Sequence, residues 1–465
     1  MNSRILALGL FLASWGFLLA QSKPNILVIL VDDLGYHDLS CNGSVIYQTP
    51  NIDSLAAQSL QFEQAYSNYP RCVPSRYSFL TGTYPIINGE VPDDGFEMNM
   101  VPENRNFVQQ FNKAGYQTAF FGKWHLGDGA SSPSSFGFDI SVAAGKAGSP
   151  ISYHYPFNKP KGNNKNVKKA PIEGLDEKCK EGDYLTDVLT DEVLNFIAAD
   201  HQDQPFMAVL SFYAVHQPLE AKYPDIKRNK EEISKHDFGD RPEYVKEGTG
   251  RTKMRQDNAN YAAMVETMDQ NVGRLLTQLK KQGIADNTII IFTSDHGGLS
   301  NDGYNQRQLA TSNYPFRAGK GWLYEGGIRV PLFVYHPSTV VAGRESQSIV
   351  LLMDVFPTLL DWVIKKPVAP EIDGQSFLKV IQHTEKWADR TVFWHESKAR
   401  PRNTGESPAS AIRSGPWKLI HFYEQNIIEL YRPAIDISEE NNLLDQFPQE
   451  SKHLLKLLNT WKASF

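Results

Sequence analysis

The amino-acid sequence predicts an α/β fold: a large, mostly parallel sheet sandwiched by helices, with a smaller C-terminal α+β subdomain built on an antiparallel sheet. Short apolar runs and amphipathic segments alternate along most of the chain, which is typical of a parallel sheet covered by helices. Beyond about residue 380 the pattern changes to closely spaced short strands joined by turn-rich links. That change predicts the smaller subdomain.

Continuous apolar runs of strand length indicate strands that are buried on both faces of the sheet. Such runs occupy Asn25–Val31, Gln117–Phe121, Met207–Phe212, Thr288–Phe292 and Pro331–Tyr335.

Helices are expected between these strands wherever an amphipathic segment stops before a glycine. Asn106–Ala114 stops before Gly115, and Asn258–Gln282 stops before Gly283. Glycine accepts the left-handed backbone that often ends a helix, so both segments are predicted helices.

The C-terminal subdomain is expected to contain four short strands and a closing helix. The strands are predicted at Arg390–Trp394, Ala411–Arg413, Trp417–Phe422 and Ile427–Tyr431, and the helix at Ser451–Trp461.

The first twenty residues have the composition of a secretory signal peptide. Arg4 supplies a positive start, Ile5–Ala20 is almost wholly apolar, and Ala20 is a small residue at a suitable cleavage point. The alternative, a membrane anchor, would need about 20 apolar residues. We therefore expect a signal peptide at 1–20, a main domain at 21–380 and a C-terminal subdomain at 381–465. The mature chain would be exported, to the periplasm or beyond it, without a membrane span.

Composition excludes several classes of function. The chain of 465 residues has 47 basic and 53 acidic residues, a net charge of −6, whereas nucleic-acid-binding proteins usually carry a basic excess. Three cysteines, Cys41, Cys72 and Cys179, are too few for a disulfide-built scaffold. A Cys41–Cys179 bridge is left open by the sequence. No Cys-x-x-Cys pair exists, which argues against zinc held by cysteine.

Two polar regions interrupt the alternation of strands and helices. Gly145–Lys180 is rich in Gly, Asn and Lys, with five lysines between Lys159 and Lys169, and Ala221–Arg255 is highly charged. We expect solvated loops in both. A second hypothesis is that the lysines contact an anionic substrate.

Polar side chains follow four of the predicted strands at the points where those strands end. Ligands of open parallel sheets bind beyond the carboxyl ends of the strands. The residues in question are Asp32, Asp33, Lys123, His125, His216, Asp295 and His296.

The segment from Cys72 to Gly82 resembles the C-x-[PS]-S-R-x-x-x-[LF]-T-G motif of type I sulfatases. Other blocks of that family follow in the same order along nearly the whole mature chain: Thr49–Ala56, Gly122–Gly127, Phe136–Asp139, His216 with Pro218, Thr293–Gly297, and Lys320 with Gly326–Pro331. The resemblance implies an alkaline-phosphatase-like fold and the hydrolysis of sulfate esters. It further implies that Cys72 is oxidised to formylglycine by a formylglycine-generating or anaerobic sulfatase-maturating enzyme.

The chemistry explains why such an enzyme would modify a cysteine. Attack at sulfur needs a strong oxygen nucleophile, and an ordinary hydroxyl is poor unless it is activated. A hydrated aldehyde offers two hydroxyls on one carbon. One attacks sulfur, and loss of the other's proton then expels sulfate.

Clustered acids after two strands indicate a cation, because converging carboxylates repel one another without one. The resemblance implies Asp32, Asp33, the modified Cys72, Asp295 and His296 as the ligands and Ca²⁺ as the ion. Oxygen ligands suit Ca²⁺ or Mg²⁺ better than zinc. Many members of the family have Asn where this chain has His296, so Mg²⁺ stays an alternative.

The remaining roles are also carried by the resemblance. Lys123 and Lys320 would bind the sulfate, Arg76 would hold the hydrated aldehyde, and His125 would deprotonate it. His216 would protonate the departing alcohol, together with Lys320. Imidazole suits these proton transfers because it titrates near neutrality. His37 and His154 lack such support and are read as structural or substrate-side residues.

Two other functions remain as alternatives: a phosphomonoester or phosphonate hydrolase of the same superfamily, and a non-catalytic glycan-binding protein. The expected substrate is a sulfated carbohydrate, such as an algal-type polysaccharide or its oligosaccharides. Trp322, Tyr153, Tyr155 and Tyr213 are interpreted either as sugar-stacking faces or as core aromatics.

Overall fold

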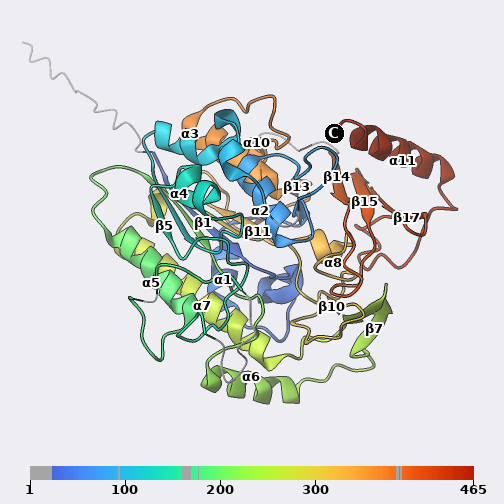
Figure 1. Ribbon diagram of the computed structural model, residues 1–465, viewed down its shortest axis with the longest axis horizontal. Coiled ribbons are helices and arrows are strands. Elements are labelled where there is room, and N and C mark those ends of the chain that lie inside the picture. Colours follow the sequence, from blue (N-terminus) through green and yellow to red (C-terminus); the bar gives the residue numbers. More distant parts are fainter. Residues whose placement is uncertain (1–22, 93–94, 160–168, 176, 384–386, 388–389) are drawn as a thin grey trace, which may run out of the picture.

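The computed structural model describes residues 23–92, 95–159, 169–175, 177–383, 387 and 390–465. Within these ranges the chain forms an eight-stranded central sheet in the order β12-β2-β11-β9-β1-β6-β4-β5 (Figure 1). In the order of the sheet, its strands are β12 (Arg344–Ser346), β2 (Leu60–Phe62), β11 (Leu332–Tyr335), β9 (Thr288–Ser294), β1 (Asn25–Val31), β6 (Phe206–Ser211), β4 (Gln117–Gly122) and β5 (Ile140–Val142).

The middle of this sheet is parallel, which confirms the predicted fold class. β1 pairs in parallel with both β6 and β9, and β4 pairs in parallel with β6 and β5. β11 runs antiparallel to β9 and β2. The carboxyl ends of β1, β9, β6 and β4 therefore meet at one edge.

Both faces of the sheet are covered, and β1 shows why its sequence is a continuous apolar run. Leu27, Ile29 and Val31 face one hydrophobic cluster, whereas Ile26, Val28 and Leu30 face the other. Alternate side chains of a strand point to opposite faces, so a strand buried on both faces has no polar positions.

Helices form the two outer layers (Figure 1). One face is covered by α1 (Pro50–Ala56), α5 (Leu185–Ala198) and α7 (Ala259–Lys281), whose buried residues belong to the first cluster. The second cluster includes residues of α2 (Cys72–Thr81), α3 (Phe107–Lys113), α4 (Pro133–Phe136), α9 (Val355–Leu359) and α10 (Leu378–Ile381).

The two predicted helix ends are confirmed. The Asn106 side chain accepts a hydrogen bond from the Gln109 amide at the start of α3, and the Asn258 side chain caps α7 in the same way. Gly115 and Gly283 follow these helices with φ values of 84° and 71°. Glycine adopts this left-handed conformation without a steric penalty.

The C-terminal region is an antiparallel sheet with a packed helix, as predicted. The sheet order is β14-β15-β16-β17, with strands β14 (Thr391–Glu396), β15 (Ala409–Ser414), β16 (Trp417–Phe422) and β17 (Ile427–Tyr431). One cluster, including Ile412, Leu419 and Leu454, joins the sheet to α11 (Pro448–Lys462). The opposite face contributes Trp394 and Ile420 to a cluster shared with the main α/β body.

The expectation of loops throughout Ala221–Arg255 is wrong. The region contains α6 (Tyr223–Lys235) and a hairpin of β7 (Tyr244–Glu247) and β8 (Gly250–Lys253), with β10 (Asn301–Asp302) paired to β8. Ile226 and Ile233 lie seven residues apart on α6 and both pack against the core. Residues at this spacing share one helix face, so even a mostly polar helix can anchor there.

Gly145–Lys180 is largely irregular where it is described, apart from an isolated bridge between His154 and Tyr184. Residues 160–168, which hold three of the five lysines, lie outside the described residues, as does the predicted signal peptide. The Lys169 ammonium donates to Ser149 Oγ (2.8 Å) and to the Pro150 carbonyl (3.0 Å), so this lysine contacts the protein itself.

The remaining elements are short. They are β3 (Ala65–Tyr66), β13 (Val350–Leu351), α8 (Glu325–Ile328), the 3-10 helices η1 (Tyr36–Asp38), η2 (Ser40–Asn42), η3 (Met98–Met100), η4 (Glu103–Arg105), η5 (Gly129–Ser131), η6 (Ala285–Asn287) and η7 (Leu352–Asp354), and the π-helical turn η8 (Leu360–Ile364).

Two further findings concern expectations from the sequence. Cys41 is an exposed free thiol, so the Cys41–Cys179 disulfide that the sequence leaves open is not formed. Among the described residues, no helix has the length and apolarity that crossing a bilayer requires.

Candidate active site

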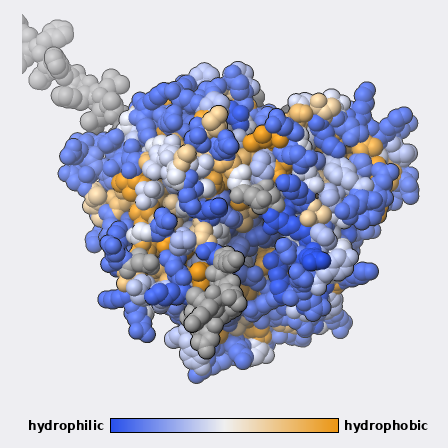
Figure 2. Space-filling view, in the orientation of Figure 1, coloured by the Kyte–Doolittle hydropathy of each residue, from blue (hydrophilic) through white to orange (hydrophobic). Residues whose placement is uncertain are grey.

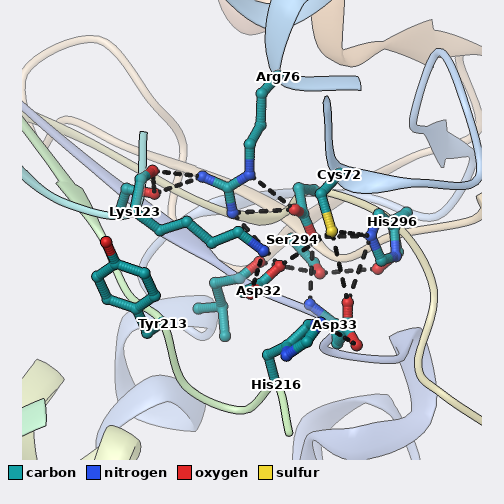
Figure 3. Close-up of polar contacts among 12 residues, drawn as sticks. Asp32, Asp33, Cys72, Arg76, Lys123, Tyr213, His216, Ser294 and His296 are labelled. Carbon is teal, nitrogen blue, oxygen red and sulfur yellow. Dashed lines mark hydrogen bonds and ion pairs between the residues drawn. The ribbon is translucent and has the colours of Figure 1, made fainter. Parts of the chain in front are cut away.

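The predicted polar residues converge at the carboxyl edge of the central sheet (Figure 3). Asp32 and Asp33 follow β1, Asp295 follows β9, and Lys123 follows β4. His296 comes directly after Asp295 in the loop that follows β9, and His216 lies in the loop that follows β6. These strands are neighbours and parallel, so the side chains that follow them meet in space.

Cys72 lies at the first position of α2, pointing into this group. Its Sγ is 3.2 Å from His296 Nε2, 3.6 Å from Asp32 Oδ1 and 4.0 Å from Asp33 Oδ1. Burial alone raises the pKa of the Cys72 thiol, but Lys123, Lys320 and His296 outweigh burial and lower that pKa well below its ordinary value. The amino-terminal end of a helix also favours negative charge. The position is therefore built to hold an anionic oxygen or sulfur atom.

Four side chains could hold a metal ion together. Potential ligand atoms of Asp32, Asp33, Cys72 and His296 all lie within 4.8 Å of one another, and all four residues are buried. His296 Nδ1 donates to the Gly297 carbonyl (3.0 Å), so Nε2 is the ring nitrogen that faces the other three residues. A hydrogen bond of this kind orients a metal-binding imidazole. Two carboxylates and an imidazole fit a divalent cation.

Asp295, the fifth predicted ligand, lies beside this group of four. Its Oδ1 is 3.6 Å from His296 Nε2 and accepts a hydrogen bond from the Asp33 amide (3.2 Å). Its Oδ2 accepts from Arg76 Nε (3.0 Å). One oxygen of Asp295 therefore faces the group and the other is held by Arg76.

Each buried carboxylate contacts a cationic side chain. Lys123 Nζ is 2.6 Å from Asp32 Oδ2, and Lys320 Nζ is 2.6 Å from Asp33 Oδ1. Lys320 Nζ also lies 3.6 Å from Cys72 Sγ. Buried charges are tolerated when they are paired and hydrogen-bonded. Lys320 thus contacts the predicted nucleophile Cys72 directly, whereas Lys123 contacts its neighbour Asp32.

Arg76 connects the carboxylates to the strand ends. Besides Asp295, its guanidinium donates to the Lys123 carbonyl (2.7 Å) and to Ser211 Oγ (2.7 Å), and its Nη2 is 3.5 Å from Asp32 Oδ1. Among the described residues, no hydrogen bond joins Arg76 to Cys72. Arg76 therefore holds the carboxylates of Asp295 and Asp32 in place, in addition to any contact that it makes with the modified Cys72.

His125 and His216 approach the nucleophile from the other loops. Burial lowers the pKa of His125, while a hydrogen bond with Cys72 opposes that shift. His216 Nδ1 donates to the Gln217 carbonyl (2.7 Å), and its Nε2 is 3.7 Å from Asp33 Oδ2. Burial lowers the pKa of His216 to about 3 against the opposing charge of Asp33. Both imidazoles are therefore neutral at pH 7 and able to accept protons.

Backbone strain also concentrates here. Asp33 and His125 both have φ values of 60°, which residues with a side chain seldom adopt. A Cβ on Gly148 would lie 2.3 Å from His125 Nε2, so only glycine leaves room for that ring. Such conformations persist at sites where the surrounding structure holds them.

Sequence reasoning missed three residues that support the site. Ser211, the last residue of β6, bridges Arg76 and the Lys123 carbonyl, and Ser75 Oγ donates to the Asp295 carbonyl (2.6 Å). Ser294 Oγ accepts from the Leu34 amide (3.1 Å) and donates to the His296 carbonyl (2.8 Å). Ser211 and Ser294 end buried strands, so the rule that singled out the aspartates could have found them as well.

The predicted sugar-stacking role of the aromatic residues is not supported. Trp322, Tyr153 and Tyr213 are buried, with at most 4% of their surface exposed, and they belong to the hydrophobic clusters. Half-buried Tyr155 packs edge-on against Phe157. These rings are core aromatics, which was the second of the two interpretations.

The two unassigned histidines make contacts within the protein. His37 packs against Phe316 and bonds the Asn42 carbonyl through Nδ1. His154 packs against Tyr184 and lies 3.2 Å from the Ala221 carbonyl through Nε2.

Comparisons with known proteins agree with this arrangement. A family model described as Sulfatase matches residues 24–365, and one for the N-sulphoglucosamine sulphohydrolase C-terminal region matches residues 317–462. A sulfatase of Formosa agariphila is 31% identical over 523 residues, covering 96% of this chain and 89% of the relative. The N-acetylgalactosamine-6-O-sulfatase of Bacteroides thetaiotaomicron is 27% identical, covering 95% and 94%.

A solved structure shares the fold. The crystal structure of Ps i-CgsB in complex with k-i-k-neocarrahexaose superposes with a TM-score of 0.72 at 28% identity, over 95% of this chain and 93% of that one.

Proposed function

The chain belongs to the sulfatase family and is a sulfuric ester hydrolase, and from this premise we propose that it removes sulfate from a sulfated glycan. We further propose that residue 72 acts as formylglycine, made by a formylglycine-generating or anaerobic sulfatase-maturating enzyme, beside a divalent cation. The observation that supports this proposal best is the meeting of Cys72 with Asp32, Asp33 and His296 at the sheet edge.

The proposed cation fits the donor set of the site. Asp32, Asp33, Asp295, His296 and the modified Cys72 would hold it. Mostly oxygen ligands suit Ca²⁺ or Mg²⁺ better than zinc, and we propose Ca²⁺ because it is the ion that the resemblance to the family implies. When bound, the cation supplies positive charge that polarises the hydrated aldehyde and the sulfate ester. Arg76 keeps Asp295 and Asp32 aimed at this position.

The two lysines support the binding of the sulfate group. Lys123 and Lys320 contact Asp32 and Asp33 in this structure, and Lys320 also reaches Cys72. Fixed ammonium groups aimed at the sulfuryl oxygens stabilise the negative charge that develops there during transfer. We propose that both lysines bind the scissile sulfate together with His216.

The histidines support opposite proton transfers. His125 contacts Cys72, so we propose that it takes a proton from the hydrated aldehyde as sulfate leaves. His216 lies across the site beside Asp33 and interacts with the charge of Lys320. Because its imidazole is neutral, we propose that His216 passes a proton from the Lys320 ammonium to the departing alcohol. Groups placed within reach of the reacting atoms perform this acid–base work efficiently.

Relatives support a carbohydrate substrate. One is an N-acetylgalactosamine-6-O-sulfatase, and one solved structure holds a neocarrahexaose. We propose a sulfated polysaccharide or its oligosaccharides, reached after export through a signal peptide at 1–20 to the periplasm or the cell exterior. The proposed domain division is 21–380 for the catalytic part and 381–465 for the C-terminal part.

The direct test is sulfate release from a panel of defined sulfated oligosaccharides by protein made together with a maturating enzyme. We expect release from at least one sulfated galactose or galactosamine unit and little phosphate from matched phosphomonoesters and phosphonates. Faster release of phosphate than of sulfate would favour the phosphonate hydrolase alternative. No turnover of any ester by fully modified protein would favour a glycan-binding protein.

A further inference from the structure

A loop of the C-terminal subdomain lies against the active-site loops. Residues 397–406 make up most of the link between β14 and β15, and we name them the basic strap because Lys398, Arg400 and Arg402 occupy alternate positions along it. Three backbone amides of the α/β body donate to carbonyls of the strap. Gly303 donates to Asn403 (3.1 Å), Tyr304 to Pro401 (3.0 Å) and Asn305 to Arg402 (2.9 Å). The strap therefore extends the wall of the site beyond the α/β body.

The strap and residues 301–305 are in close backbone contact. A Cβ on Gly303 would lie 2.0 Å from the Pro401 carbonyl oxygen, so the two backbones touch where a side chain could not fit. The Trp322 indole and the Asn301 side chain both donate to the Thr404 carbonyl (2.8 and 2.9 Å). The position of the strap is thus set by buried hydrogen bonds.

Residues 301–308, which bond to the strap, also contact the loops that carry the catalytic residues. At one end, the Asn301 side chain donates to the Lys320 carbonyl (3.2 Å). At the other end, the Gln308 carbonyl accepts from the side chain of Gln217, which adjoins His216 (2.6 Å). Arg307 lies between these ends, so it borders the site between the strap and His216.

Arg307 has donors without acceptors. Its Nε and Nη2 atoms are buried and make no hydrogen bond to any described residue. The acidic groups that interact with Arg307 are Asp33, Asp302 and Glu406. Asp33 pairs with Lys320, and Asp302 lies 3.3 Å from Arg251. Glu406, which belongs to the strap, lies 3.9 Å from Arg71. Burial lowers the pKa of Arg307, with Asp33 as the first opposing charge, which agrees with a guanidinium near the catalytic carboxylates.

Buried donors without acceptors are costly, and a bound ligand, ion or water molecule is one of the arrangements that satisfies them. The planar guanidinium matches the two oxygens of a carboxylate or sulfate group. Figure 2 shows that the surface between the α/β body and the C-terminal subdomain is mainly hydrophilic, which suits a charged ligand. Arg400 interacts electrostatically with Arg307 and adds positive charge on the strap.

We propose that Arg307, with the basic strap beside it, forms a subsite for a second oxyanion of the glycan, next to the sulfate that is cleaved. This inference rests on the proposed function and narrows its substrate class. The preferred substrate carries at least two acidic groups on the same or neighbouring sugars. The second group is a carboxylate or a further sulfate, which share the oxyanion chemistry that the guanidinium recognises.

Competitive inhibition of an aryl sulfatase assay tests the subsite without requiring that the sugar is cleaved. Hydrolysis of 4-nitrophenyl sulfate is measured at increasing concentrations of one competing sugar at a time. The sugars are galactose 6-sulfate, a carrageenan tetrasaccharide and a chondroitin 6-sulfate tetrasaccharide. In the wild-type enzyme at least one tetrasaccharide should inhibit at lower concentration than galactose 6-sulfate. The Arg307→Gln variant should weaken that inhibition by about tenfold or more while its inhibition by galactose 6-sulfate changes little.

The pattern across inhibitors identifies the second group. An Arg307-dependent effect with the carrageenan sugar, which lacks carboxylates, identifies a sulfate, and an effect confined to the chondroitin sugar identifies a carboxylate. Arg307→Lys should recover part of the affinity because it keeps the charge but loses the paired geometry. The wild-type inhibition should also weaken with salt more steeply than that of Arg307→Gln.

A matched control removes one positive charge elsewhere. Arg228 is on α6 and pairs with Glu266, so Arg228→Gln should leave all inhibition constants within about twofold. Equal inhibition of wild type and Arg307→Gln by every sugar would overturn the subsite, as would tetrasaccharides that inhibit no better than galactose 6-sulfate. Absence of turnover of 4-nitrophenyl sulfate and of every sulfated oligosaccharide by the modified wild type would instead contradict the proposed function.

Discussion

At the scale of single residues, the site is an arrangement of paired charges around Cys72. Three buried carboxylates, Asp32, Asp33 and Asp295, each contact Lys123, Lys320 or Arg76. Removing one partner of a buried pair leaves an uncompensated charge, which is more costly than never having had the pair. The residues that perform the proposed chemistry therefore also affect stability.

Arg76 tests this coupling between stability and the site. Arg76→Met removes the cation shared by Asp295 and Asp32, so the free energy of unfolding should fall by about 3–5 kcal/mol. Urea denaturation monitored by tryptophan fluorescence measures the change. Arg228→Gln, at an exposed ion pair on α6, should change it by less than about 1 kcal/mol. Similar values for both variants would contradict the structural role given to Arg76.

A second residue-scale prediction concerns the proposed cation. Asp33→Asn keeps the size of a central ligand but removes its charge, so activity should fall at least about 100-fold and recover partly at high Ca²⁺. Wild-type activity should likewise disappear after exhaustive chelation and return with Ca²⁺ more fully than with Mg²⁺. Full activity of metal-free protein, checked by elemental analysis, would show that no cation is required.

The polar residues of the site were predictable because strand ends meet at one edge of a parallel sheet. That rule placed Asp32, Asp33, Asp295 and His296 together, and the structure confirms that they lie side by side. It could not place Arg307, which follows no strand of the central sheet and lies in a segment that is held by backbone hydrogen bonds to residues 397–406. Such contacts depend on the packing of two distant segments, which local sequence patterns do not encode.

At the scale of elements, capping residues define where the helices begin. The Asn106 side chain accepts from the Gln109 amide (3.1 Å) and donates to the Phe136 carbonyl (2.7 Å), so one side chain starts α3 and ties it to α4. Asn106→Ala should lower the free energy of unfolding by about 1–2 kcal/mol. Asn106→Asp keeps the cap acceptor and should lose less. Calorimetry that finds both variants equal to wild type would contradict this assignment.

The sequence predicted elements well where burial imposes a pattern and poorly where it does not. Strands such as Asn25–Val31 are confirmed because two covered faces require an unbroken apolar run. Helix α6 was missed because most of its side chains are polar and only a narrow stripe, including Ile226 and Ile233, contacts the core.

At the scale of the whole molecule, a buried charge network joins the C-terminal sheet to the α/β body. Lys418 of β16 lies 2.9 Å from Glu325 of α8 and 2.8 Å from Glu439. Glu439 also accepts a hydrogen bond from the Glu325 amide (2.7 Å). Because α8 follows Lys320 and the C-terminal sheet carries the basic strap, this network sets the position of the strap relative to the site.

The network predicts a pH dependence of stability. Burial, opposed by Lys418, raises the pKa of Glu439 to about 7 from an ordinary 4.5. Between these values the folded state holds a proton that the unfolded state has lost, so this residue makes stability fall as pH rises from 4.5 to 7. The contribution is at most about 1.4 kcal/mol per pH unit.

Denaturation curves of wild type and Glu439→Gln across this range measure the effect. The free energy of unfolding should decline more steeply with pH in the wild type than in the variant. Glu325, whose pKa is lowered to about 2, loses its stabilising charge only below pH 4.5 and does not interfere. Parallel curves for the two proteins would mean that Glu439 titrates normally.

Mass spectrometry of the peptide that contains residue 72, combined with activity of the same sample, tests the central claim most directly. Conversion of the cysteine to formylglycine should lower the peptide mass by about 18 Da. Sulfate release should rise in proportion to the converted fraction and vanish in Cys72→Ala. Full activity in protein whose residue 72 is entirely an unmodified thiol would contradict the account.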